Sequence, residues 1–172
     1  MKKILIFLIV FYIVAIVFMP KENLYFTLKN TLKSEQIGLN EESLSDNFVS
    51  LKALGLVVSY DGIKSLQAKE LVVTPFLFYN KIKAYEVSAA SSFKEMFRFS
   101  ADEVEITYAI WNYNEAKIYA TGDFGELNGV FDLQKKSLQV VLKPSMEFEN
   151  SSMLRQHFKK SEEGYIYETK IK

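Results

Sequence analysis

The run from Ile4 to Met19 constrains this chain more than any other feature, because it holds no charged residue, no amide and no glycine. As a helix it would be about 24 Å long, somewhat short of the roughly 30 Å hydrocarbon core of a bilayer. Lysines flank it on both sides, and their long apolar stems let the ammonium groups reach the lipid headgroups. The run is apolar on every side, which is typical of a membrane helix rather than of a soluble one. We expect a transmembrane anchor whose lipid-facing side chains include Ile4, Phe7, Phe11, Ile16 and Phe18.

A cleaved signal peptide starts with the same pattern, in which Lys2 and Lys3 precede an apolar run, and it is the alternative interpretation. Cleavage needs small residues at two positions just before the cut, whereas only Ala15 is small near the end of the run. The sequence therefore favours an uncleaved, single-pass anchor. The positive-inside rule places the two lysines in the cytoplasm, although Lys21 weakens the contrast. We predict an anchor over residues 1–20 at the inner membrane, and a domain over residues 21–172 in the periplasm of a two-membrane bacterium.

The composition of the remainder is that of one ordered domain. About 150 residues are enough to bury a real core. The chain has 10 tyrosines and 14 phenylalanines but only 3 prolines, which favours an aromatic-rich, mostly β domain. Because there are 0 cysteines, disulfides and thiolate sites are excluded and packing alone must hold the domain together. The formal net charge of +0 provides no basic stripe for nucleic acid.

The segment from Glu22 to Glu35 has the apolar spacing of an amphipathic helix. Three leucines recur at every fourth position: Leu24, Leu28 and Leu32. We expect this leucine stripe to pack on the following sheet, and the alternative is contact with the membrane surface or with a partner helix. Gly38 is expected to end the helix, and residues 40–46 are expected to form a polar turn.

From residue 48 onward the apolar pattern changes to period two, which predicts strands joined by short turns. The expected strands cover residues 48–52, 54–60, 66–74, 81–89, 98–110, 117–124, 127–133, 138–143 and 165–171. Asp61-Gly62 is a hairpin signal, Pro75 ends a strand, and residues 76–80 form an aromatic corner. Residues 92–97 are a helical turn or a bend, and residues 146–160 are polar and compatible with a helix. The predicted fold class is mostly β: a transmembrane helix and a short amphipathic helix, then an antiparallel β meander of about eight strands.

No constellation of residues indicates catalysis. His157 has neither a second histidine nor a cysteine with which to bind zinc or form a triad, so we interpret it as a surface residue. Glu103 and Glu105 occur in an alternating segment and are interpreted as the solvated face of a strand. Asp123-Phe124-Gly125 matches a kinase tripeptide, but the other kinase motifs and the necessary length are missing. We therefore expect no enzyme activity, no cofactor and no metal site.

A long meander with an apolar inner face can also curl into a groove that holds lipid tails. The side chains expected on that face are Val72, Phe76, Phe78, Ile106, Ile110, Phe131 and Val140. The simpler interpretation is that these residues fill an ordinary core. A surface for a partner or for lipid is expected from the leucine stripe and from aromatic residues, and its members are Leu24, Leu28, Leu32, Phe76, Phe78, Tyr165 and Tyr167.

Several segments carry a family resemblance, in order along nearly the whole chain. They are the short anchor, Leu24-Tyr25-Phe26 with the two leucines that follow, residues 71–80 (LVVTPFLFYN), residues 129–133 (GVFDL) and residues 161–168 (SEEGYIYE). In these segments the chain resembles the GspN-type proteins of type II secretion. The resemblance implies a bitopic inner-membrane protein with a periplasmic β-rich domain related to AsmA-like sheets.

The same resemblance implies a structural or accessory subunit of an envelope-spanning machine, with no catalytic residues to carry over. The machine would be a type II secretion system, a type IV pilus-like system or a flagellar motor, in which such relatives serve as scaffold. The expected partners are protein subunits of that complex and the lipid bilayer, with a homo-oligomeric ring as one arrangement. An exposed sheet edge would recruit partners by strand addition. The alternative function is a periplasmic lipid-binding or lipid-transfer protein with an apolar β groove.

Overall fold

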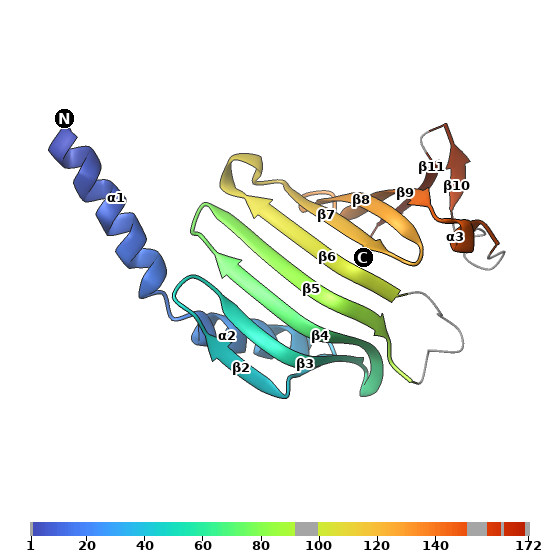
Figure 1. The fold of residues 1–172 in the computed structure, drawn as a ribbon, viewed down its shortest axis with the longest axis horizontal. Helices are drawn as coiled ribbons and strands as arrows, with labels where there is room; N and C mark the ends of the chain where they lie inside the picture. The colour runs from blue at the N-terminus through green and yellow to red at the C-terminus, as the bar shows by residue number, and fades with distance from the viewer. Residues whose placement is uncertain (1, 92–99, 151–157, 163, 171–172) are drawn as a thin grey trace.

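The computed structural model describes residues 2–91, 100–150, 158–162 and 164–170, and these form one antiparallel sheet with three α-helices (Figure 1). The helices are α1 (Lys2–Val17), α2 (Lys21–Ser34) and α3 (Met146–Asn150), with a 3₁₀ turn η1 (Ile110–Asn112). The strands are β1 (Ile37–Asn40), β2 (Ser43–Asp46), β3 (Leu51–Tyr60), β4 (Ile63–Pro75), β5 (Tyr79–Ala89), β6 (Ser100–Ala109), β7 (Glu115–Gly122), β8 (Gly125–Asp132), β9 (Ser137–Pro144), β10 (Lys159–Ser161) and β11 (Gly164–Lys170).

The sheet is a meander from β3 to β9, which confirms the mostly β, antiparallel prediction. The strand order is β1-β3-β4-β5-β6-β7-β8-β9-β11-β10, and β2 also pairs with β3. Short connections explain most of this order, because turns of two to five residues join the successive strands from β3 to β9, except between β5, which ends at Ala89, and β6, which begins at Ser100. Asp61-Gly62 makes the predicted hairpin turn between β3 and β4, and Pro75 ends β4 as expected.

The start of the sheet differs from the prediction. Residues 40–46 were expected to form a turn, but β1 and β2 both pair with β3 as two pieces of one interrupted edge strand. Gly38 lies inside β1 instead of ending the preceding helix, because Gln36 takes the left-handed conformation there (φ 64°). The two predicted strands at 48–52 and 54–60 are the single strand β3, and residues 47–50 form the turn before it.

The end of the chain differs as well. Residues 146–160 were expected to be helix-tolerant throughout, yet Lys159–Ser161 forms strand β10 and pairs with the start of β11. These added short strands raise the strand total above the predicted eight. They carry little apolar pattern of their own, so pairing with a long neighbour decides their conformation. Residues 92–97, for which a turn or a bend was predicted, lie outside the described residues.

Helices α1 and α2 are separated by a short break after Val17 and are bent by 56° relative to each other. Within the described part of the chain, neither helix alone is long and apolar enough to cross a membrane, whereas the bent pair together meets that criterion. Figure 1 shows α1 lying outside the sheet, on the side where the β4–β5 and β6–β7 turns lie, and α2 at the β3 end.

Helix α2 packs on the sheet with a different face from the one predicted. Leu24 and Leu28 are 50% and 44% exposed, and of the leucine stripe only Leu32 packs against a core cluster. The buried face instead carries Lys21, which is 3% exposed, and Tyr25. Acidic side chains on the edge strand cause this rotation, because they offer these two residues ionic and hydrogen-bonding partners.

The partners of this buried face are well defined. The Lys21 ammonium lies 3.1 Å from the Asp46 carboxylate, and Lys29 lies 2.8 Å from Glu41. The Tyr25 hydroxyl donates to Glu41 over 3.0 Å. Burial first, and then this hydrogen bond and the carboxylate charge, raise the pKa of Tyr25 above its ordinary value. A buried charge is tolerated only when it is paired, so these contacts fix the helix on β1 and β2.

A crease crosses the sheet at one level of four neighbouring strands. The residues at the crease drop out of the regular strand pairing, and they are Gly55, Lys69, Glu86 and Asp102. Gly55 and Glu86 have φ angles of 61° and 49°, and the register of β6 against β7 shifts next to Asp102. The gap between β1 and β2 lies opposite Gly55, so the crease continues to the sheet edge.

The crease reverses the alternation of side chains along each strand. Residues three apart lie on one face across it, where a regular strand would place them on opposite faces. The pairs are Ala53 with Leu56, Ala68 with Leu71, and Ala84 with Val87. Apolar side chains on both sides of the crease therefore share one face, which we call the apolar face, and the opposite one is the polar face.

Candidate functional site

The most distinctive surface is a stripe of apolar side chains across the apolar face. Two neighbouring rows of it contain no polar side chain over seven strands, from β3 to β9. One row is Leu51, Val73, Ile82, Ile106, Ile118, Gly129 and Val140, and the other is Ala53, Leu71, Ala84, Val104, Ala120, Leu127 and Leu142. We call these residues the apolar stripe.

Helices lie at the two ends of the apolar stripe. Leu32 of α2 packs on the cluster of Leu39, Leu56 and Ala68, against which Leu71 and Ala84 of the stripe also pack, and Phe148 of α3 packs against Leu142. The helices with extended sheet contacts lie on β1 and β9, and Figure 1 shows no helix over the middle strands in the part of the chain described. There Ile106 and Ile118 are only half-buried. The middle of the stripe is therefore available to an apolar partner.

The seven residues that were expected on the inner face of a lipid groove do not all lie on one face of the sheet. Ile106, Phe131 and Val140 lie on the apolar face, as expected. Val72 lies on the polar face, because it pairs with Lys52 and Lys83. The remaining three, Phe76, Phe78 and Ile110, lie beyond the strand ends in turns. The reversal at the crease explains the error for Val72, since regular alternation was assumed.

A second surface is formed by the turns at one end of the strands. The register places four turns at this end: residues 47–50, 76–78, 110–114 and 133–136. They carry exposed large apolar side chains, which are Phe48, Val49, Leu77, Phe78, Ile110, Trp111, Tyr113 and Leu133. We call this end of the sheet the aromatic rim. Turns are normally polar, so an apolar set shared by four of them is a candidate interaction surface.

Helix α1 is docked against the aromatic rim. The Tyr12 hydroxyl donates to the Phe76 carbonyl over 2.8 Å, and the Tyr12 ring stacks on Phe78 with centroids 5.7 Å apart. Leu8, Ile9, Phe11 and Ala15 share a hollow with the same turn. The apolar helix and the apolar turns thus form one continuous surface.

The polar face carries a network of lysines and glutamates. Glu105 lies 3.0 Å from Lys81 and 3.1 Å from Lys83, which also lies 2.5 Å from Glu103. Partial burial alone would raise the pKa of Glu105, but the hydrogen bonds and charges of the two lysines lower it overall. The same pairs raise the pKa of both lysines. Glu103 and Glu105 thus share the face opposite Ile106, as predicted, and each has a cationic partner.

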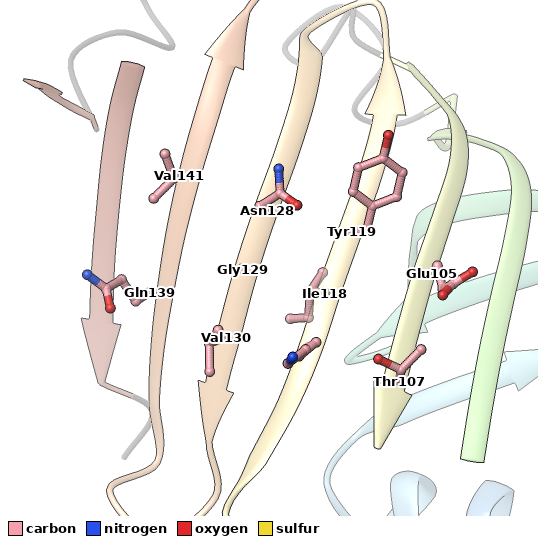
Figure 2. A pocket seen from close by; sticks show the side chains of 10 residues that line it. Glu105, Thr107, Ile118, Tyr119, Asn128, Gly129, Val130, Gln139 and Val141 are labelled. Carbon is pink, nitrogen blue, oxygen red and sulfur yellow. The ribbon is translucent and has the colours of Figure 1, made fainter. Parts of the chain in front are cut away.

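A shallow hollow of about 460 Å³ lies on the polar face of β6–β9 (Figure 2). Figure 2 shows Tyr119, Asn128 and Gln139 around it, with Glu105 and Thr107 on one side. The carboxylate at this hollow is that of Glu105, which is already paired with Lys81 and Lys83. A general acid or base must be free to exchange a proton with a substrate, and these ion pairs do not leave Glu105 free in that way. Among the described residues, no group of three or more histidine, cysteine, aspartate or glutamate side chains is placed to hold a metal ion.

The predicted site residues do not form one surface. Ile4, Phe7 and Phe11 are exposed along α1, and Phe18 is exposed just after its end, but Ile16 is buried. Tyr165 is 7% exposed and packs on Phe148 inside the second core cluster, so it is not a surface residue. Tyr167 is half-buried beside Phe158. The residues predicted as a partner or lipid surface therefore do not lie together in one patch, and His157 lies outside the described residues.

The leucines and aromatics of that set lie in three separate places. Leu24 and Leu28 are exposed on α2, Phe76 and Phe78 belong to the β4–β5 turn, and the two tyrosines lie on β11. Sequence reasoning missed the rest of the aromatic rim, because it assigned residues 48–52 and 98–110 to strands and recognised an aromatic corner only at residues 76–80. The signal that could have found them is the clustering of Phe48, Trp111 and Tyr113 at strand ends.

Comparison with known proteins adds no relative. No protein-family model matches the chain, and neither a curated protein nor a solved structure is similar enough to count as a match.

Proposed function

We propose that this protein is a non-enzymatic structural subunit of an envelope-spanning complex, anchored in the inner membrane by α1. In this proposal the N-terminus is cytoplasmic, and the sheet lies in the periplasm and contacts other protein subunits. The observation that carries the proposal is the apolar stripe, whose middle is half-buried and without a covering helix among the described residues. Apolar surface of this kind favours association, because burying it releases roughly 25 cal/mol per Å².

The membrane anchor is supported by the exposure of α1. Its apolar side chains point outward along almost its whole length, and Ile4, Phe7 and Phe11 are each more than half exposed. Such a helix is unfavourable in water and favourable in hydrocarbon. At 16 residues it is shorter than a standard span, so Phe18 and Met19 would extend it, and the long stems of Lys2 and Lys3 would let their ammonium groups reach the headgroups.

The absence of enzymatic activity is supported by the state of the titratable groups. Each described group with a displaced pKa has a structural explanation, as Glu105 has in its two lysines and Tyr25 in Glu41. Catalytic sites instead leave a perturbed group facing a cleft. The hosts suggested by the resemblance are a secretion system, a pilus-like system or a flagellar motor. If the partner is a second copy of this chain, the proposed complex is a homo-oligomeric ring.

Site-directed crosslinking on the intact chain tests the proposal. Because the sequence has 0 cysteines, Ile106→Cys and Thr107→Cys each introduce a single thiol, on opposite faces of β6. Each variant is labelled in native membranes with a thiol-reactive benzophenone, irradiated and analysed by mass spectrometry. We expect protein adducts at residue 106 that are absent or much weaker at 107. Protein adducts of equal yield at both positions, or no protein adduct at either, would contradict the subunit role.

Lipid binding is the second candidate function, and the shape of the apolar stripe favours it. Its seven strands, about 4.8 Å apart, make it about 29 Å long, whereas its two rows are only about 7 Å apart. A long and narrow apolar strip suits an extended acyl chain better than a broad protein interface of about 800 Å² per partner. In the same experiment, lipid adducts at residue 106 without protein adducts would replace the first proposal with this one.

A further inference from the structure

The aromatic rim has the composition of a membrane interface. Tyrosine and tryptophan are enriched at the headgroup level of bilayers, because their rings are apolar and their N–H or O–H groups can remain hydrated. Trp111 is 67% exposed and stacks on Tyr79 with centroids 6.3 Å apart, and Tyr113, two residues later in the same turn, is exposed as well. Phe48, on a turn more than 60 residues earlier, is 81% exposed.

The rim is continuous with a helix that needs lipid around it. Tyr12 holds the β4–β5 turn against α1, by its hydrogen bond to Phe76 and its stacking on Phe78. Turn carbonyls are costly in hydrocarbon unless they are paired, and the Phe76 carbonyl accepts both from the Phe78 N–H within the turn and from the Tyr12 hydroxyl. Figure 1 shows the turns at this end of β4–β7 on the side of the sheet where α1 lies. A bilayer that receives α1 is therefore adjacent to the rim as well.

We propose that the aromatic rim lies in the interface of the same bilayer, so that the sheet stands on the membrane with its strands directed away from it. This inference rests on the membrane anchoring proposed above. Four turns and one helix would then hold the sheet at a fixed orientation, rather than letting it swing on a tether. The apolar stripe would run roughly parallel to the membrane surface, since it crosses the strands.

Tryptophan fluorescence tests this placement in the unmodified chain, because Trp111 is the sole tryptophan. The full-length protein is reconstituted into vesicles of phosphatidylcholine and phosphatidylglycerol. A fraction of the lipid carries a spin label, placed either near the headgroup or near the end of the acyl chain. We expect Trp111 to lose most of its emission with the shallow label, and to lose little with the deep label. Emission that is unaffected by either label, and quenched only by a water-soluble quencher, would overturn the proposal.

Two variants make the result specific. In a Trp111→Phe background, Tyr60→Trp places the fluorophore at the β3–β4 hairpin, on the opposite end of the sheet, where we expect no quenching by labelled lipid. In the same background, Phe7→Trp reports α1 itself. Quenching at residue 7 without quenching at 111 would refute the rim contact and leave the anchor intact. No quenching at residue 7 would refute the anchor, and with it the proposed subunit at the inner membrane.

Discussion

The hydroxyl of Tyr12 is the one polar side-chain group between Ile4 and Met19, and it bonds to a turn of the sheet. An apolar helix would gain nothing from a phenol unless the hydroxyl found a partner, because an unpaired polar group in hydrocarbon is costly. Tyr12 therefore determines how α1 meets the β4–β5 turn. This hydrogen bond fixes the position of α1 along the turn, because it is directional and apolar contacts are not.

Replacing Tyr12 tests this role. We expect Tyr12→Phe to lower the free energy of unfolding in detergent by about 1 kcal/mol, because the Phe76 carbonyl loses one of its two donors and keeps only the Phe78 N–H, while the ring stacking on Phe78 is kept. Circular dichroism during thermal unfolding measures the change. The matched control is Tyr60→Phe at the exposed hairpin on the opposite end, which should leave stability unchanged. Equal effects from the two variants would show that the hydrogen bond does not contribute.

Glu105 makes stability depend on acid pH. Its pKa in the folded protein lies below the ordinary value of 4.5, so it contributes stability that is present above pH 4.5 and lost as the pH falls through the folded pKa. We expect Glu105→Gln to destabilise the protein at pH 7 by up to about 1 kcal/mol, because the pairs are partly exposed. This difference from the natural protein should shrink below pH 4.5.

Denaturant unfolding at several pH values measures the Glu105 effect. Glu126→Gln is the control, since Glu126 of β8 is exposed and lies on the polar face of the sheet, as Glu105 does. A Glu105→Gln difference that stays constant from neutral to acid pH would contradict the ionic origin of the contribution.

At the scale of elements, helix α2 shows why hydrophobic spacing did not identify its buried face. Leucines four apart predict a packed stripe, but the helix is turned so that Lys21 meets Asp46 of β2 and Tyr25 meets Glu41 in the gap between β1 and β2. A buried ammonium without its carboxylate would be far more costly than two exposed leucines. The polar pairs therefore decide the rotation of the helix.

Substitutions on α2 should follow the observed face. We expect Tyr25→Ala to cost about 3 kcal/mol, as truncation of a buried aromatic ring does. Leu28→Ser, on the exposed side, should change stability by less than about 0.5 kcal/mol. Thermal unfolding of both variants in the same detergent compares them directly. A larger loss for Leu28→Ser than for Tyr25→Ala would restore the predicted stripe as the packing face.

Gly55 makes a prediction for the crease. Its φ of 61° is a left-handed conformation, and a Cβ there would lie 2.4 Å from the Glu42 side chain. We expect Gly55→Ala to cost at least about 1 kcal/mol, from the strained backbone alone. Gly62→Ala, in the hairpin, has a φ of 77° with nothing within 4 Å, so it should cost less because it carries only the backbone strain. Unfolding by urea ranks the two variants, and the reverse order would mean that Glu42 moves aside freely.

For the whole molecule, the meander was predictable and its exceptions were local. Alternating residues identified β3 to β9, because each long strand has an apolar and a polar side that the sequence shows. The short strands β1, β2 and β10 could not be identified, since they depend on a neighbour for their conformation. Gly55 inside a strand was a signal for irregularity, whereas Glu86 at positive φ gave none.

The candidate surfaces were less predictable than the sheet. Ile106 and Val140 were expected on the inner face and lie on it, but the apolar stripe as a whole depends on register between strands, which one sequence does not reveal. The aromatic rim depends on four turns that the meander brings to one end. Both surfaces are properties of the assembled sheet and not of any segment.

Hydrogen exchange should reveal the same hierarchy across the molecule. Strands β5–β7 have paired neighbours on both sides, so their amides should exchange slowest. Those of β2 and β10, which lie at the two edges, should exchange much faster. Mass spectrometry of the protein in detergent, after timed exposure to deuterated water, measures the difference. Protection of β10 equal to that of β6 would indicate that another chain or element covers that edge.

The crease also bears on how this chain can change in length over evolution. At the crease, four strands interrupt the alternation of their side chains at the same level, at Gly55, Lys69, Glu86 and Asp102. The alternation between the two faces is therefore set separately on each side of the crease. A one-residue insertion or deletion elsewhere in a strand would turn every side chain beyond it to the wrong side. At the crease, the same event could be absorbed by an irregularity that is already present. Insertions and deletions among related sequences should therefore concentrate at the crease and in the turns.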